Sequence, residues 1–337
     1  MLLALPLITQ TTSAPLTAPQ MNNSVSRGEE IPPRFSVQPT LKRGGAVFPN
    51  KYYAWNALLS CARVVGQLAW TQGISGVLCD SQPFVVLKFT SNNPPKPVFQ
   101  TRTTIWSLLE LFNYWAEWLE QRLPRFPELS FFTFLDSQDT SSRLGIGQVV
   151  SGPATPRVTL DTVSVDSPAS AAPLQILTPN PFAGNGTLDN STVLTAPPFN
   201  VGLYVDPRGG QACSEITFHR VLLKTMVAYS EYDFDAPIPF EIRRYYADQD
   251  FTFKLGATSH AAAEEGTFTV KLVLDALYMT AIRMQSVEPR ARFHDFEGKI
   301  VIGPSSAGRR GTRLIGKISM KKGDHTESNS EQPVDLA

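Results

Sequence analysis

The densest group of potential ligand side chains in this 337-residue sequence is a run of alternating acidic and aromatic residues. It consists of Glu231, Asp233 and Asp235, separated by Tyr232 and Phe234. If the segment is extended, its three carboxylates lie on one side, because successive side chains of a strand point to opposite faces. Carboxylates grouped in this way could bind Ca²⁺ or the hydroxyls of a sugar. The competing interpretation is a solvated loop that binds nothing.

Two aromatic residues form a second candidate surface. Tyr114 and Trp118 lie one turn apart on a predicted helix over 102–122, partly off its apolar stripe. They could therefore expose an aromatic patch to a partner or a sugar. The other four tryptophans are predicted to belong to the core: Trp55, Trp70, Trp106 and Trp115.

Local motifs for catalysis are absent from the sequence. The four histidines have no metal-binding spacing, and no Gly-x-Ser-x-Gly elbow or phosphate-binding glycine loop occurs. We therefore predict that the protein has no metal, no cofactor and no catalytic residues that belong to a local sequence motif. The sequence favours a non-enzymatic protein that binds an unknown small molecule, glycan or protein. An enzyme whose site is assembled around Glu231, Asp233 and His219 remains the alternative.

Charge and hydropathy limit the partners. The chain has 30 Lys and Arg against 30 Asp and Glu, so no overall field attracts it to nucleic acid, and no nucleic-acid partner is predicted. No apolar run approaches the roughly 18 residues that a membrane span needs. An apolar start followed by small residues up to Ala14 resembles a signal peptide without its basic region. Together with sequons at Asn22, Asn185 and Asn190, it favours a secreted glycoprotein; a cytoplasmic protein is the alternative.

The cysteines are few and odd in number. Cys61 lies on the apolar stripe of a predicted helix, where a thiol usually behaves as a small core hydrophobe. A Cys61–Cys79 bridge is possible in an oxidising compartment, and Cys213 would then stay unpaired.

The two halves of the chain share a sequence pattern. Phe35-Ser36-Val37 corresponds to Phe199-Asn200-Val201, 164 residues later, and Arg143-Leu144 corresponds to Arg313-Leu314, 170 residues later. Further matches keep the same order between these points. Such collinear self-similarity predicts an internal duplication.

Each half is predicted to form a strand, a helix, a second strand, a longer helix and a hairpin. The predicted ranges are 35–41, 50–70, 84–90, 102–122 and 128–135 with 143–150, then 199–205, 215–230, 251–257, 267–285 and 292–302 with 312–320. Ser214 is a predicted helix N-cap. The predicted fold is α+β, with helices packed on antiparallel or mixed sheet and the two units related by a pseudo-twofold axis.

The domain limits follow from this pattern and from composition. A signal-like segment and tail occupy 1–29, the two repeats occupy 30–152 and 195–320, a Pro/Thr/Asn-rich linker occupies 153–194, and a polar tail occupies 321–337.

The duplicated order of a Tyr-rich helix, a short strand, a helix led by Thr-x-x-Trp and a hairpin that ends in Ile-Gly-x-Val resembles a family of ascomycete fungal proteins. Members are typically predicted to be secreted and have no assigned activity. The resemblance covers roughly residues 30–320 and implies a fungal origin without assigning any site residue. The missing basic region at the N-terminus departs from the secreted pattern of the family.

Overall fold

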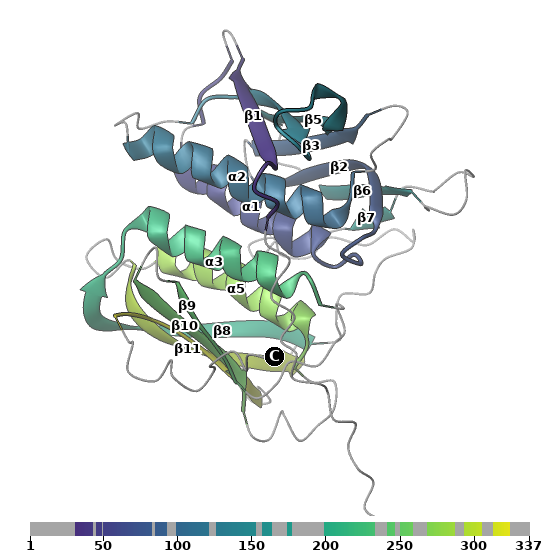
Figure 1. Ribbon diagram of the computed structural model, residues 1–337. Coiled ribbons are helices and arrows are strands. Elements are labelled where there is room, and N and C mark those ends of the chain that lie inside the picture. The colour runs from purple at the N-terminus through teal and green to yellow at the C-terminus, as the bar shows by residue number, and fades with distance from the viewer. Residues whose placement is uncertain are drawn as a thin grey trace, which may run out of the picture. The chain divides into compact units, whose positions relative to one another are not determined.

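The computed structural model contains four α-helices and two antiparallel sheets in the residues that it describes (Figure 1). This confirms the α+β class. The described residues are 31–42, 45–48, 50–82, 85–92, 99–120, 126–152, 157–163, 174–176, 199–232, 241–246, 250–258, 268–286, 293–304 and 313–323.

The first sheet has seven strands in the order β1-β4-β5-β3-β2-β6-β7, and every neighbouring pair is antiparallel. The strands are β1 Ser36–Leu41, β2 Gly73–Gln82, β3 Val85–Ser91, β4 Leu129–Phe134, β5 Arg143–Val150, β6 Arg157–Val163 and β7 Leu174–Ile176. In β3, Val85, Leu87 and Phe89 are buried while Lys88 and Thr90 are exposed. One face of the sheet therefore packs on the core, and the other face is solvated at this strand.

The second sheet has five strands in the order β8-β11-β12-β10-β9, again antiparallel throughout. The strands are β8 Phe199–Ala212, β9 Glu241–Tyr246, β10 Phe251–Ala257, β11 His294–Pro304 and β12 Arg313–Lys322. Phe253, Leu255 and Ile318 are fully or almost fully buried on one face, and Lys317 is exposed on the other.

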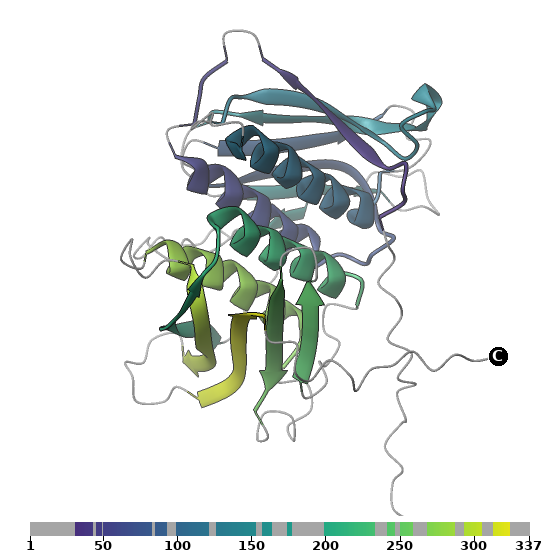
Figure 2. The same cartoon turned by 60° about the vertical axis from the view of Figure 1, so that its left-hand side comes forward.

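Helices α1 (Lys51–Val65) and α2 (Thr101–Glu120) run along one face of the seven-stranded sheet (Figures 1 and 2). Asn50 caps α1 by accepting a hydrogen bond from the backbone nitrogen of Tyr52 at 2.9 Å. Nearly every residue from Ala54 to Val65 is buried. A helix that is apolar all round must be covered on all sides, and the sheet covers only one of them.

Helices α3 (Glu215–Tyr229) and α5 (Val270–Gln285) lie along one face of the five-stranded sheet (Figure 1). Ser214 Oγ accepts a hydrogen bond from Thr217 N at 3.0 Å, which confirms the predicted N-cap of α3.

The helices of the two sheets contact each other: α1 contacts both α3 and α5, and α2 contacts α3. At Gly66, just after α1, an added Cβ would lie 2.5 Å from Ser230 Oγ at the end of α3. The absence of a side chain at Gly66 is what allows the two helix ends to approach this closely. These contacts cover the remaining sides of α1 and join the described apolar side chains into one core.

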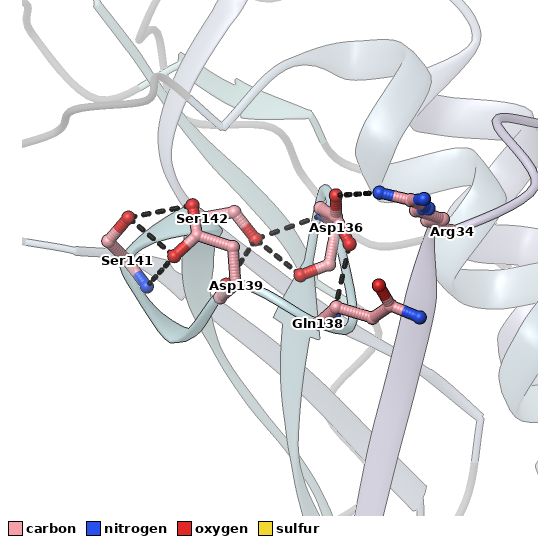
Figure 3. A network of polar contacts seen from close by, with 6 residues as sticks. All are labelled: Arg34, Asp136, Gln138, Asp139, Ser141 and Ser142. Carbon is pink, nitrogen blue, oxygen red and sulfur yellow. Dashed lines mark hydrogen bonds and ion pairs between the residues drawn. The ribbon is translucent and has the colours of Figure 1, made fainter.

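The loop between β4 and β5 is held by the Asp and Ser residues expected of a hairpin turn (Figure 3). Asp136 accepts a hydrogen bond from Gln138 N at 2.9 Å and forms a 3.2 Å ion pair with Arg34. Asp139 accepts from Ser141 N at 2.8 Å and so caps a 3₁₀ turn, Thr140–Ser142. The network fixes the turn and ties the chain before β1 to it.

The predicted helices agree with the structure to within a few residues, except that α1 ends at Val65 rather than near residue 70. Four strands were missed: β2, β9, β6 and β7. The last two lie within the segment that we interpreted as a linker and extend the seven-stranded sheet. Among the described helices, none is long and apolar enough to cross a membrane.

Candidate functional site

A buried polar network lies where the helices of the two sheets meet. Gln285 Nε2 on α5 donates to Asn56 Oδ1 on α1 and to His219 Nε2 on α3, both at 2.8 Å. Asn56 Nδ2 donates back to Gln285 Oε1, also at 2.8 Å. Three helices from the two sheets therefore share one hydrogen-bond network.

The hydrogen bonds assign the tautomer of His219. An amide nitrogen can only donate, so His219 Nε2 must accept, and the ring proton is on Nδ1. That proton is donated to the carbonyl oxygen of Glu215, 2.7 Å away. Both ring nitrogens are therefore occupied.

The surroundings keep His219 neutral. Its side chain is fully buried, and its ring centroid lies 4.5 Å from that of Trp55. Burial lowers the pKa of His219 from 6.5 to about 4, although the nearby Glu215 opposes this shift. A neutral imidazole with both nitrogens bonded and no solvent access cannot serve as a general base for an external substrate.

Two charged groups flank the network at its α1–α3 side. Glu215 accepts a hydrogen bond from Tyr52 Oη at 2.8 Å and forms an ion pair with Lys51. Further along α1, Arg63 pairs with Asp275 of α5 at 3.4 Å. These contacts join the two sets of helices, as a structural interface would require.

The cysteines do not form a reactive centre. The structure joins Cys61 on α1 and Cys79 on β2 in a disulfide, with their Cα atoms 5.6 Å apart. Cys213 is a free, buried thiol, and burial raises its pKa to about 12. Because the thiolate is the nucleophile, Cys213 is inert at neutral pH.

The structure separates the residues of the alternative enzymatic site. His219 lies near the start of α3, and Glu231 follows its end. Twelve residues of helix correspond to about 18 Å, so the two side chains do not converge. Asp233 and Asp235 lie outside the described residues, as do Asn22, Asn185 and Asn190. Within the described part of the chain, no three His, Cys, Asp or Glu side chains are grouped to hold a metal ion.

Tyr114 and Trp118 do lie together. Their ring centroids are 6.1 Å apart on α2, and both side chains are partly exposed. Burial raises the pKa of the Tyr114 hydroxyl above its ordinary value of 10. A phenol with a pKa of 10 or more is protonated at neutral pH, so this hydroxyl can donate a hydrogen bond. The rings are half embedded in the core, so their orientation is restrained by packing.

Three polar residues share this side of α2. The positions 110, 113 and 117, and likewise 110, 114 and 118, are three or four residues apart, so Glu110, Asn113 and Glu117 share one side of the helix with the two aromatic residues. Asn113 Nδ2 donates to Glu110 Oε1 at 3.4 Å. Burial raises the pKa of Glu110, and the neighbouring Glu117 adds to the shift while Asn113 opposes it. We call these five residues the α2 stripe.

Only the two aromatic members of the α2 stripe, Tyr114 and Trp118, were predicted from the sequence. The spacing of 110, 113, 114, 117 and 118 was available in the sequence and would have identified the polar members. The partners of His219 carried no such signal, because Asn56 and Gln285 are 229 positions apart.

Comparison of the chain with protein-family models, curated proteins and solved structures gave no match.

Proposed function

We propose that this chain is a non-enzymatic binding protein whose α2 stripe binds a neutral carbohydrate. The observation that carries the proposal is the pair of partly exposed rings, Tyr114 and Trp118, next to carboxylate and amide groups on the same side of one helix. Other partners, such as a small molecule or a protein, are outcomes of the test below.

The chemistry of the stripe suits a sugar. Aromatic rings offer apolar faces on which the C–H face of a sugar ring can pack. Glu110 and Glu117 supply acceptors for hydroxyl protons, and Asn113 supplies both a donor and an acceptor. The same carboxylates would repel an anionic ligand, which favours a neutral one.

The enzymatic alternative has less support. Of its three residues, His219 is used in the buried network, and Glu231 lies at the opposite end of α3. No observation on the described residues places an accessible acid, base and nucleophile together.

We also infer that the two sheets and their helices arose by duplication. If the strands of each half are counted from first to fifth along the chain, both sheets have the order first, fourth, fifth, third, second. These orders are β1-β4-β5-β3-β2 in the first sheet and β8-β11-β12-β10-β9 in the second. The sequence matches at offsets of 164 and 170 residues support the same inference.

Secretion is part of the proposal, and the Cys61–Cys79 disulfide supports it because such bonds persist in oxidising compartments. Protein from a eukaryotic host should therefore lose apparent mass after treatment with an N-glycosidase. An unchanged mass together with an intact Met1 by mass spectrometry would assign the protein to the cytoplasm instead.

The binding proposal is tested by a thermal-shift screen of neutral oligosaccharides. A ligand that binds only the native state stabilises it by about 2.7 kcal/mol at 100 times its Kd. We expect one class of oligosaccharide to raise the Tm of the wild-type protein, and Tyr114→Ser and Trp118→Ser each to remove that rise.

Tyr232→Ser is the matched control. Tyr232 is 37 % exposed and belongs to the acidic run at 231–235, the other candidate surface. The control should respond to the ligand as the wild type does. If Tyr232→Ser loses the ligand-induced rise in Tm and Trp118→Ser retains it, the binding surface is the acidic run. That result would contradict the proposal.

A further inference from the structure

The α2 stripe contains the same combination of side chains twice. Asn113 is followed by Tyr114, and one helical turn later Glu117 is followed by Trp118. Each pair places a hydrogen-bonding side chain beside a partly exposed aromatic ring. Four residues of α-helix rise about 6 Å, and the two ring centroids are 6.1 Å apart. The rings therefore repeat along α2 at a spacing that is close to the length of one sugar unit in a chain.

The two rings do not lie in one plane. The angle between the planes of Tyr114 and Trp118 is 48°. Side chains four positions apart on an α-helix are offset by about 40° around its axis, because each residue turns the helix by about 100°. The tilt of the rings is close to the offset that the helix backbone imposes. A flat ligand therefore cannot lie against the faces of both rings at once.

Packing restrains both rings in this arrangement. Tyr114 and Trp118 pack against the hydrophobic core. Trp118 Nε1 is buried and has no hydrogen-bond partner among the residues that the structure describes. Any exposed surface of the indole is therefore carbon, which is the kind of surface on which the C–H face of a sugar packs. Turning either ring would withdraw apolar surface from the core, so the ligand must adapt to the tilt.

We propose that the α2 stripe binds a neutral glucan whose chain twists from one sugar to the next. This rests on the carbohydrate binding proposed above and specifies its ligand. A β-1,4-linked glucan is a flat ribbon whose sugar faces are parallel, so it can stack on only one of the two rings. In α-1,4- and β-1,3-linked glucans each sugar is inclined to the previous one. Two consecutive sugars of such a chain can pack on Tyr114 and Trp118 while Asn113 and Glu117 bond to their hydroxyls.

An apolar segment of a protein partner is the other ligand that could cover two aromatic rings. The core of a protein–protein interface is depleted in charged residues. Three members of the α2 stripe are polar, and Glu117 is exposed beside Trp118. The repeat of one ring with one polar side chain matches units that each have an apolar face and an edge of hydroxyls, which favours the glucan.

The test compares three hexasaccharides of equal length by isothermal titration calorimetry on the full chain. Maltohexaose has α-1,4, laminarihexaose β-1,3 and cellohexaose β-1,4 linkages. We expect at least one of the two twisted chains to bind about tenfold more tightly than cellohexaose, because it gains the contact with a second ring. The tighter of the two twisted chains identifies the linkage.

Variants show whether the second ring causes this preference. Tyr114→Ser leaves only Trp118, so it should bind the preferred twisted chain about as weakly as the wild type binds cellohexaose. Tyr232→Ser removes an exposed ring outside the α2 stripe and should keep the wild-type preference. Circular dichroism without ligand checks that each variant is folded. The comparison of hexasaccharides on the wild type needs no substitution, so it tests the proposal even if Tyr114→Ser does not fold.

The outcomes separate this inference from the proposed function. If cellohexaose binds as tightly as the twisted chains and Trp118→Ser abolishes its binding, the stripe binds carbohydrate and only the inference of a twisted chain is overturned. The same holds if Tyr114→Ser keeps the preference, since the second ring would then play no part. If none of the three hexasaccharides binds, or if both Tyr114→Ser and Trp118→Ser bind as the wild type does, the proposed function is overturned as well.

Discussion

Acidification should destabilise this protein by about 3 kcal/mol through His219 alone. The folded pKa of His219 is about 4, whereas an unfolded histidine titrates near 6.5. Between these values the unfolded chain binds a proton that the folded chain rejects. The contribution of His219 is therefore complete above about pH 6.5 and is lost as the pH falls towards 4.

Carboxylates also titrate between about pH 4 and 6.5 and change the stability of the protein. A variant without the imidazole separates the contribution of His219 from theirs. His219→Gln keeps a hydrogen-bonding side chain but cannot be protonated. It should be less stable than wild type near neutral pH, because it loses the ring that packs on Trp55. The deficit should shrink by about 3 kcal/mol between about pH 7 and about pH 4.

Urea unfolding followed by circular dichroism across this pH range supplies the measurement. A difference between wild type and His219→Gln that stays constant with pH would mean that His219 is exposed to protons in the folded state. That result would return His219 to the list of potential catalytic bases.

Gly147→Ala should lower the free energy of unfolding by about 2–3 kcal/mol. Gly147 of β5 is opposite Phe131 of β4 and Phe89 of β3, and both rings are almost fully buried. A Cβ at Gly147 would lie 1.9 Å from Phe131 Cζ, so the Phe131 ring would have to move into a packed core.

Gln148→Ala is the control on the same strand, since Gln148 is exposed and should lose no more than about 0.5 kcal/mol. A smaller aromatic neighbour should relieve the clash: Phe131→Leu should cost less in the Gly147→Ala background than in wild type. Chemical denaturation of the two single variants and the double variant supplies the measurement. If their losses in the free energy of unfolding simply add, Phe131 does not pack over Gly147.

The same contact explains why glycine stands at this position of β5. In the structure, Gly147 provides the space that the Phe131 ring fills. Gly316 of β12 has the same relation to Phe268, whose Cε2 atom would lie 2.4 Å from a Cβ placed there.

Most helices and hairpins could be predicted because their signals are local. The apolar periodicity of α2 and the Ser214 cap of α3 each depend on only a few neighbouring residues. The missed strand β2 has no such signal: Gly73, Ser75 and Asp80 interrupt its apolar residues, and its pairing is irregular at two places. Its place between β3 and β6 is set by partners rather than by its own propensity.

The candidate site was predictable only where it is local. Tyr114 and Trp118 are four positions apart, so helical geometry alone brings them together. The network of Asn56, His219 and Gln285 depends on how α1, α3 and α5 pack, which no pairwise spacing encodes. Consequently His219 was open to a catalytic interpretation from the sequence, and its packing in the structure supports a structural role.

The central claim, that the α2 stripe is the ligand-binding surface, is tested most directly by hydroxyl-radical footprinting with the oligosaccharide found in the screen. Oxidation of Tyr114 and Trp118, read by mass spectrometry, should fall when the ligand is bound, while oxidation of Tyr232 and Tyr245 should not change. Protection of Tyr232, with Tyr114 and Trp118 oxidised as in the free protein, would contradict the claim.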